Sequence, residues 1–158
     1  MSVTIRAIEA KDKEEWVNLW TGPNGYIEFY GSSNIITPEI TNTTFDRFLN
    51  PNDPTYCNVA VNSETGKLIG FATYLTHRNT WTVEDTCYLN DLFVCESNRL
   101  GGVGRKLIES VYKSADELNC KNTYWLTQFH NHRAQMLYTK VGVKAGFLVY
   151  ARPNNNYL

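Results

Sequence analysis

The chain has 158 residues, of which 42% are hydrophobic and 20% charged, and its formal net charge is −1. This length and composition predict one folded domain over residues 1–158 with a substantial hydrophobic core, and they exclude a disordered chain. The nearly neutral charge argues against a nucleic-acid-binding surface, and no apolar run approaches the roughly 18 residues that a membrane span needs.

Two capping patterns punctuate the first half of the chain. Asp12, with Glu15 three residues later, resembles a capping box, and Thr43 with Asp46 marks the start of a second, shorter helix. The expected elements in this half are a strand over 3–8, a helix from about 13 to 21, a loop or broken helix over 26–36, a short helix from 43 to 50, and an antiparallel strand pair at 56–61 and 67–77.

The second half alternates apolar strands with amphipathic helices. Asn131 is a good N-cap and Gly142 a plausible stop signal for the last helix. The expected elements are a strand over 87–94, a helix from 103 to 118, a strand over 123–127, a helix from 132 to 141, and a last strand over 144–150. The order predicts one α/β (α+β) domain, with a mixed, mostly antiparallel sheet, a parallel pair near its middle and about four flanking helices.

A glycine-rich turn lies between the strand over 87–94 and the helix that follows it. Three of the four residues 101–104 are glycine, so the first amide N–H groups of the helix stay uncovered. These groups and the helix dipole favour an anion, and Arg99, Arg105 and Lys106 add positive charge. The turn therefore predicts a phosphate site at the helix N-terminus.

Several phosphate motifs compete for this turn. A Walker A loop needs a Gly-Lys-Ser/Thr ending, but Gly104 is followed by Arg105. A dinucleotide fingerprint needs a glycine where Leu107 stands, and a plain glycine-rich turn stays open as an alternative. The pattern Arg99-x-x-Gly102-x-Gly104 resembles the pyrophosphate loop of the GNAT acyltransferase superfamily, whose members bind acetyl-CoA.

A second segment extends this resemblance over nearly the whole chain. Asn131-x-x-Ala134-x-x-x-Tyr138-x-x-x-Gly142 matches the GNAT pattern in the right order and separation. The segments YLNDLFV and NHRAQMLYTKVG are most similar to small fungal acetyltransferases described as acting on histones, polyamines or D-amino acids, and YLNDLFV also resembles the diamine acetyltransferases. The resemblance implies a GNAT domain whose central strand splays from its parallel neighbour at a bulge.

The resemblance also implies how acetyl-CoA binds. The pantetheine arm bonds to backbone groups that the splay leaves open, and the pyrophosphate sits on the amides of the glycine turn. Asn131 resembles the family residue that touches the cofactor arm, although it would also serve as a plain helix cap. The residues expected to bind the cofactor are Leu92, Phe93, Val94, Arg99, Leu100, Gly101, Gly102, Val103, Gly104, Arg105, Asn131 and Ala134.

Two side chains are expected to be catalytic. The resemblance implies that Tyr138 faces the CoA sulfur and gives a hydrogen bond or proton to the leaving thiolate, although by its helical position it would equally be a core tyrosine. The diamine enzymes carry Glu-Asp where this chain has Asn90-Asp91, and an asparagine cannot accept the proton. Asp91 is therefore the first candidate for the base, with Glu28 or a water chain as alternatives.

The acceptor site is expected to include Glu28, Tyr30, Trp81 and Asp91. Aromatic faces attract an ammonium group and would equally suit an aromatic amino acid, whereas the plainer role of Tyr30 and Trp81 is to anchor loops. His130 and His132 have no acidic or thiol partner at ligand spacing, so no metal is expected.

These features predict an acetyl-CoA-dependent N-acetyltransferase that acts on a primary amine of a small molecule, a polyamine or an amino acid. The alternatives are a protein or histone lysine acetyltransferase and a non-catalytic acyl-CoA sensor; the neutral charge weakens the histone alternative. No nucleic acid or membrane partner is expected, and the resemblance implies a homodimer or homotetramer. The four cysteines form no Cys-x-x-Cys pair and no secretory signal is seen, so we expect free thiols and a cytoplasmic, possibly also nuclear, protein.

Overall fold

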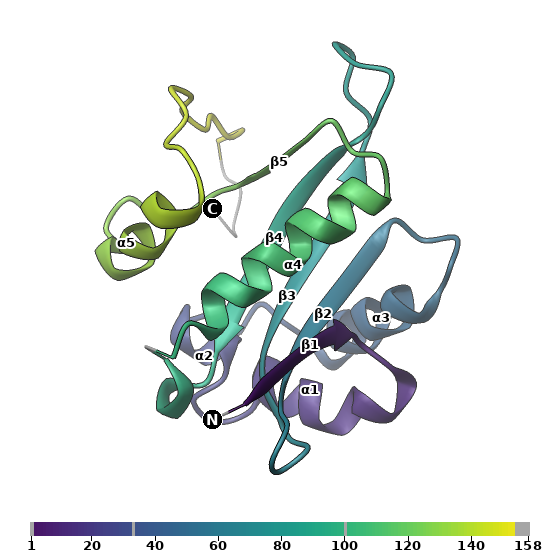
Figure 1. Cartoon of the computed structure of the whole chain (residues 1–158), viewed down its shortest axis with the longest axis vertical. Coiled ribbons are helices and arrows are strands. Elements are labelled where there is room, and N and C mark those ends of the chain that lie inside the picture. Colours follow the sequence, from purple (N-terminus) through teal and green to yellow (C-terminus); the bar gives the residue numbers. More distant parts are fainter. Residues whose placement is uncertain (1, 33, 100, 154–158) are drawn as a thin grey trace.

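Five strands form one sheet in the order β1-β2-β3-β4-β5, seen in a computed structural model that describes residues 2–32, 34–99 and 101–153 (Figure 1). The first four strands pair antiparallel and β4 pairs with β5 in parallel, which confirms the predicted mixed sheet. The strands are β1 (Val3–Ala7), β2 (Thr55–Asn62), β3 (Leu68–His77), β4 (Thr86–Val94) and β5 (Asn122–Trp125).

Helices cover both faces of the sheet (Figure 1). One face carries α1 (Lys13–Thr21), α2 (Tyr26–Phe29) and α3 (Pro38–Leu49), and the other carries α4 (Val103–Glu117) and α5 (His132–Val141). Apart from the single turn of α2, four helices are nine residues or longer, as predicted. None of the helices in the described part of the chain combines the length and apolarity that crossing a bilayer would take.

The two faces have different cores. On the α1–α3 face aromatic rings dominate. Trp16 stacks on Trp20 at 5.5 Å between ring centroids, Phe71 packs against both from the sheet, and Phe93 packs against Phe71. On the α4 face the buried core is mostly aliphatic, with Tyr74 as its one buried aromatic residue among those described. The apolar stripe predicted for α4 had seven residues. Five of them are buried there, Tyr112 is half-buried, and Leu118 lies just past the helix and is exposed; the buried five are Val103, Leu107, Ile108, Val111 and Ala115.

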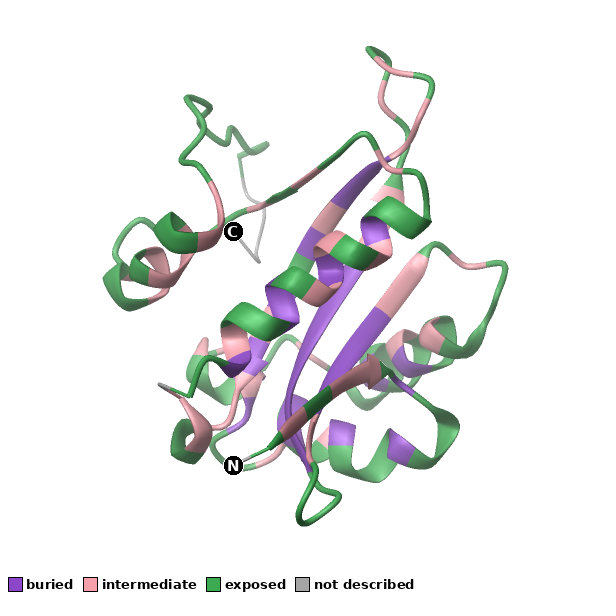
Figure 2. Cartoon of the chain, in the orientation of Figure 1, coloured by how far each residue is buried: buried purple, intermediate pink, exposed green. Residues whose placement is uncertain are grey.

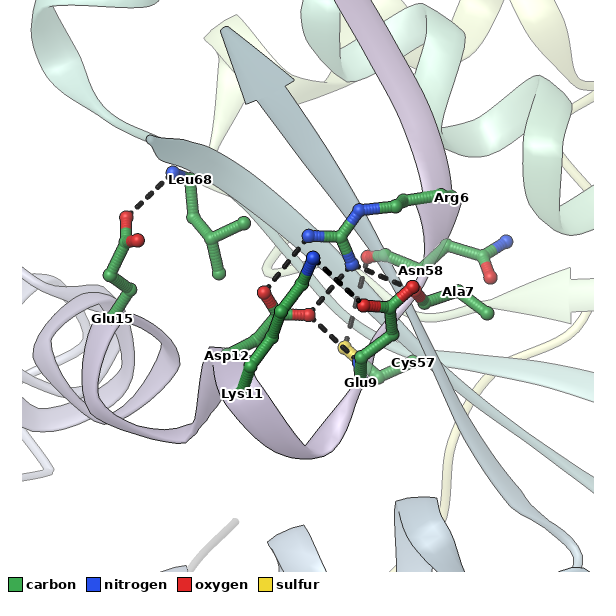
Figure 3. A network of polar contacts seen from close by, with 9 residues as sticks. All are labelled: Arg6, Ala7, Glu9, Lys11, Asp12, Glu15, Cys57, Asn58 and Leu68. Atoms are coloured by element: carbon green, nitrogen blue, oxygen red, sulfur yellow. Dashed lines mark hydrogen bonds and ion pairs between the residues drawn. The ribbon is translucent and has the colours of Figure 1, made fainter. Parts of the chain in front are cut away.

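The start of α1 was predicted at the right residue for the wrong reason (Figure 3). Asp12 does not form a capping box with Glu15; its carboxylate accepts two hydrogen bonds from Arg6 at 2.7 and 2.9 Å and one from the Glu9 N–H at 2.8 Å. Glu15 instead accepts from the backbone N–H of Leu68 at 2.8 Å, which ties α1 to β3. A bidentate guanidinium is a stronger partner for a buried carboxylate than a helix amide, so the local pattern was overridden.

The start of α3, the second helix predicted from the sequence, was predicted five residues too late. The prediction began at Thr43, whereas α3 begins at Pro38 and Thr37 caps it by accepting a hydrogen bond from the Ile40 N–H at 3.2 Å. Threonine at the N-cap followed by proline is a favourable helix start because proline fixes the backbone and needs no N–H partner there.

The predicted strand over 144–150 is wrong. Residues 143–150 form no regular structure and pair with no strand, and their apolar side chains are open to solvent: Val143 is 95% exposed, Phe147 91% and Tyr150 92%. An alternating apolar segment becomes a strand only when a neighbouring strand satisfies its backbone groups. β5 is therefore the outermost strand of the described sheet.

A bulge in β4 and an early end to its pairing with β5 prepare the site. The β3–β4 register pairs Thr73 with Asp91 and Tyr74 with Leu89, so Asn90 is the extra residue of a bulge. On its other side β4 pairs with β5 only from Thr86 to Leu89. No strand in the described part of the chain pairs with this edge of β4 after Leu89, as the splay that the family resemblance implied requires.

Candidate active site

The open edge of β4 carries the backbone groups of Leu92 and Val94. Beyond the strand, the Cys95 N–H donates to the Ile69 carbonyl of β3 at 2.9 Å. Because backbone groups alternate in direction along a strand, those of Phe93 also face β3 and those of Leu92 and Val94 face the splay. The Val94 carbonyl indeed accepts a hydrogen bond from Arg99 Nε at 2.9 Å rather than from a strand.

The glycine turn presents the bare N-terminus of α4. Gly102 is the N-cap, with φ of +76° in the left-handed region, and no side chain caps the helix. A Cβ at Gly102 would meet no atom of a described residue within 4 Å, so the turn is open at this position among the residues that the structure describes. The first turn of α4 contains no acidic residue, so the amides of residues 103–105 suit an anion. Leu100, also expected in this site, lies outside the described residues.

Gly104 has a different role in the same turn. A Cβ on this residue would lie 3.1 Å from Leu137 and 3.9 Å from Val94. The glycine therefore allows the first turn of α4 to approach both α5 and β4, which brings the turn close to the open edge of β4.

Asp91 is a buried carboxylate, 8% exposed, on the face covered by α1 and α2. The bulge at Asn90 gives Asp91 this direction, and the Asn90 side-chain amide donates to it at 2.9 Å. Burial raises the pKa of Asp91 above the ordinary value, while the hydrogen bond from the Asn90 amide acts against this rise. The group is a better proton acceptor at neutral pH than an exposed aspartate would be.

Two tyrosines of the α2 segment lie beside this carboxylate. The rings of Tyr26 and Tyr30 are 4.8 Å apart, and Tyr26 also stacks on Trp20 at 5.3 Å. Burial and the charge of Asp91 raise the pKa of Tyr30, whereas Arg99 and a hydrogen bond with Asn131 lower it. Tyr30 therefore lies among three of the predicted site residues. Tyr26 was not predicted; its spacing of four from Tyr30, one helical turn, is the signal that would have found it.

Tyr138 lies at the point where β5 ends. Its ring packs edge-on against Trp125, the last residue of β5, at 5.5 Å. Burial, together with Tyr30, raises the pKa of Tyr138 to about 12, so the phenol stays protonated at neutral pH and can donate a hydrogen bond. Asn131 caps α5 as predicted, since its side-chain oxygen accepts from the Ala134 N–H at 3.2 Å.

The structure thus brings Asp91, Tyr30, Asn131 and Tyr138 together, and it leaves two predicted acceptor residues apart from them. Trp81 lies 94% exposed in the loop between β3 and β4, at the far end of β4 from Arg99. Glu28 is exposed on α2, and its carboxylate accepts from the Asn24 N–H at 2.5 Å. Within residues 2–32, 34–99 and 101–153, no three His, Cys, Asp or Glu side chains are grouped to hold a metal ion.

Comparison with known proteins yields one family and many structures of the same fold. The profile of the acetyltransferase (GNAT) family matches residues 14–143. The D-amino-acid N-acetyltransferase HPA3 of Saccharomyces cerevisiae is 46% identical over 150 residues, which cover 95% of this chain and 90% of the yeast protein. Among solved structures, a probable acetyltransferase has a TM-score of 0.79 at 22% identity, covering 97% of both chains. AAC(6')-Iy, solved with the bisubstrate analogue CoA-S-monomethyl-acetylneamine, has a TM-score of 0.76 at 19% identity, covering 96% of this chain and 98% of the other.

Proposed function

The chain belongs to the acetyltransferase (GNAT) family and is an acetyl-CoA-dependent acetyltransferase, and from that premise we propose that its acceptor is the primary amine of a small molecule. An amino acid is the first choice, because the yeast relative is named a D-amino-acid N-acetyltransferase, and a polyamine is the second. The observation that carries the proposal is the meeting of Asp91, Tyr30 and Tyr138 at the point where β5 leaves β4.

The open edge of β4 and the start of α4 fit the two ends of acetyl-CoA. The backbone groups of Leu92 and Val94 would bond to the pantetheine amides, as a further strand would. The amides of residues 103–105, with the exposed Lys106 beside them, would hold the diphosphate. Bound acetyl-CoA supplies the thioester carbonyl that the amine attacks.

Asp91 would take the proton that the amine loses. Its raised pKa moves it toward the operating pH, which favours a general base. Because the carboxylate is buried, the proton reaches it through a water or through the neighbouring Tyr30 hydroxyl. This assignment makes Glu28 unnecessary as a base.

Tyr138 would serve the leaving group. As the C–N bond forms and the C–S bond breaks, negative charge develops on sulfur, and a phenol that is still protonated can donate to it. The two protons balance. One leaves the amine toward Asp91, and one passes from Tyr138 to the thiolate. Solvent then reprotonates Tyr138.

Thiol release from acetyl-CoA with a panel of acceptors tests this function. We expect release with amino acids or polyamines and little with histone-tail peptides, since neither the net charge of the chain nor its acidic residues favour a basic peptide. A preference for histone tails would make the chain a protein lysine acetyltransferase instead. Binding of acetyl-CoA without release for any acceptor would make it a sensor and overturn the proposal.

We also propose that the chain forms a homodimer or a larger homo-oligomer. Two features support this. β5 is the outermost strand of the described sheet, and the apolar residues of 143–150 are exposed. A second copy would give both a partner, because exposed β-forming segments readily pair with another chain.

A further inference from the structure

Arg99 has an unusual environment for a cationic side chain. Its guanidinium carbon lies 5.2 Å from the ring centroid of Phe29 on α2 and 5.8 Å from that of Phe93 on β4. Its Nε donates to the Val94 carbonyl at 2.9 Å. Two aromatic faces and one backbone bond thus fix the guanidinium between α2 and the open edge of β4.

Arg99 has no acidic partner in the part of the chain that the structure describes. The five ion pairs found there involve Arg6, Lys11, Arg47, Arg78 and Arg105. Nε is also the only side-chain nitrogen of Arg99 that hydrogen-bonds to a described residue, so both terminal nitrogens keep their donors. A half-buried guanidinium with two donor groups side by side is suited to a carboxylate, which it can bind bidentately.

The opposite charge is that of Asp91, which lies two residues before Phe93 on the same buried face of β4. The negative charge of Asp91 raises the pKa of the Tyr30 phenol, and the positive charge of Arg99 lowers it, so the phenol lies within the influence of both. In an α-amino acid the ammonium and the carboxylate are attached to the same carbon, so the two opposite charges are always close together. A site that offers an anion and a cation beside the same cluster of aromatic rings matches that zwitterion and not a polyamine, which a cation would repel.

We propose that the Arg99 side chain binds the α-carboxylate of an amino-acid acceptor and selects amino acids over simple amines and polyamines. This inference rests on the proposed function and names the substrate class of that same site. The diphosphate does not need this side chain, because the amides of residues 103–105 and Lys106 lie at the start of α4 itself. When the pantetheine arm takes the Val94 carbonyl, Nε is released, while the contacts with Phe29 and Phe93 can keep the guanidinium in place.

The experiment compares two acceptors that differ only by the carboxylate, such as D-phenylalanine and 2-phenylethylamine. In the wild type we expect the amino acid to have the higher kcat/KM. Arg99→Gln should lower the ratio of kcat/KM for the amino acid to kcat/KM for the amine by about 10- to 100-fold, since a charge-assisted bidentate contact with the carboxylate is lost. Arg99→Lys should fall between, because it keeps the charge but not the planar fork.

The matched control is Arg47→Gln, which removes the same charge from an exposed position on α3 and should leave both acceptors unaffected. Melting curves of all variants establish that each is folded. An equal loss for both acceptors, with a raised KM for acetyl-CoA, would place Arg99 on the cofactor and overturn the inference alone. A wild type that prefers the amine would do the same. No thiol release with any acceptor would overturn the proposed function and this inference together.

Discussion

The part of the chain up to Ala115 and the part after it are packed very differently (Figure 2). Every buried residue of the described chain lies in the first part, most of them on the inner strands β2, β3 and β4 and the helices that cover them, whereas none of residues 116–153 is buried. The active site draws on both parts. Asp91 comes from the well-packed part and Tyr138 from the loosely packed one, so the proton acceptor is held more rigidly than the group that serves the sulfur.

Few contacts hold α5 in place. The Tyr112 hydroxyl donates to the Val141 carbonyl at 2.7 Å, and Leu137, Tyr138 and Val141 pack partly buried against the α4 core. At the end of the helix Gly142 lies directly against the ring of Trp125. These contacts place Tyr138 near Tyr30 without enclosing it, which leaves room for the helix to adjust when acetyl-CoA enters.

Removing a large side chain from each part gives the largest contrast. Trp16 is 0% exposed and contacts four other aromatic rings, so Trp16→Ala should lower the free energy of unfolding by about 3–5 kcal/mol. Trp81→Ala deletes the same atoms from an exposed loop and should change it by less than about 0.5 kcal/mol. Denaturant unfolding measures both, and similar losses would show that the aromatic core does not dominate stability.

Asp91→Asn separates activity from stability in the well-packed part. It removes the proposed base, so kcat/KM at neutral pH should fall by about 10²-fold or more, while the exposed Asp46→Asn should leave it unchanged. Because burial raises the pKa of Asp91, the native state holds this proton at pH values where the unfolded chain has lost it. Wild-type stability should therefore fall as pH rises from the ordinary aspartate pKa through the raised one.

Asp91→Asn has no titrating carboxyl at this position, so its free energy of unfolding should not show this part of the fall with rising pH. Unfolding curves of Asp91→Asn and wild type over pH 3 to 8 test the sign. An equal pH dependence of stability in the two proteins would contradict the raised pKa, and unchanged kcat/KM would remove Asp91 from catalysis.

Asp91 also shows what the sequence could and could not predict. The strand over 87–94, the α4 stripe and the Asn131 cap are local patterns, and the structure confirms them. The direction of Asp91 depends on the bulge at Asn90, which arises from the register with β3 and leaves no local signal. The strand predicted over 144–150 failed for a related reason, since a partner strand is a property of the whole fold.

Capping patterns were informative only where no distant partner competed. Thr37-Pro38 is a sufficient local signal for the start of α3, and the pattern at Thr43 lies inside the helix. Asp12 gave a misleading signal, because Arg6 comes to it from β1. The candidate site was predictable where the family pattern fixes it and not where side chains from α2 complete it, as with Tyr26.

A methyl group at Gly142 tests how loosely α5 is held. A Cβ there would lie 2.7 and 3.0 Å from two atoms of the Trp125 ring. At these distances the new methyl group and the ring cannot both keep their positions. Gly142→Ala should therefore shift the end of α5 and cost about 1–3 kcal/mol of unfolding free energy. Gly146→Ala is the matched control, because a Cβ there meets nothing within 4 Å.

The shift should affect the sulfur side of the site more than the carboxylate side. Because Tyr138 contacts Trp125, kcat should fall in Gly142→Ala, while the acid limb of the pH profile that Asp91 produces should stay where it is. A variant with normal kcat would mean that α5 tolerates displacement without moving Tyr138 from its working position.

The smallest expected effect concerns the exposed segment 143–150. Phe147 is 91% exposed, so in an isolated chain Phe147→Ser removes no buried surface and should change the free energy of unfolding by less than about 0.5 kcal/mol. In the proposed dimer the same ring is covered by the second copy, and the variant should then lower the association constant and make the melting temperature depend on protein concentration. Sedimentation of the wild type and the variant at several concentrations separates the two cases. If the wild type is a monomer at every concentration, the segment has no partner copy and the dimer is excluded; if the wild type self-associates and Phe147→Ser does so equally, the copies meet on another surface.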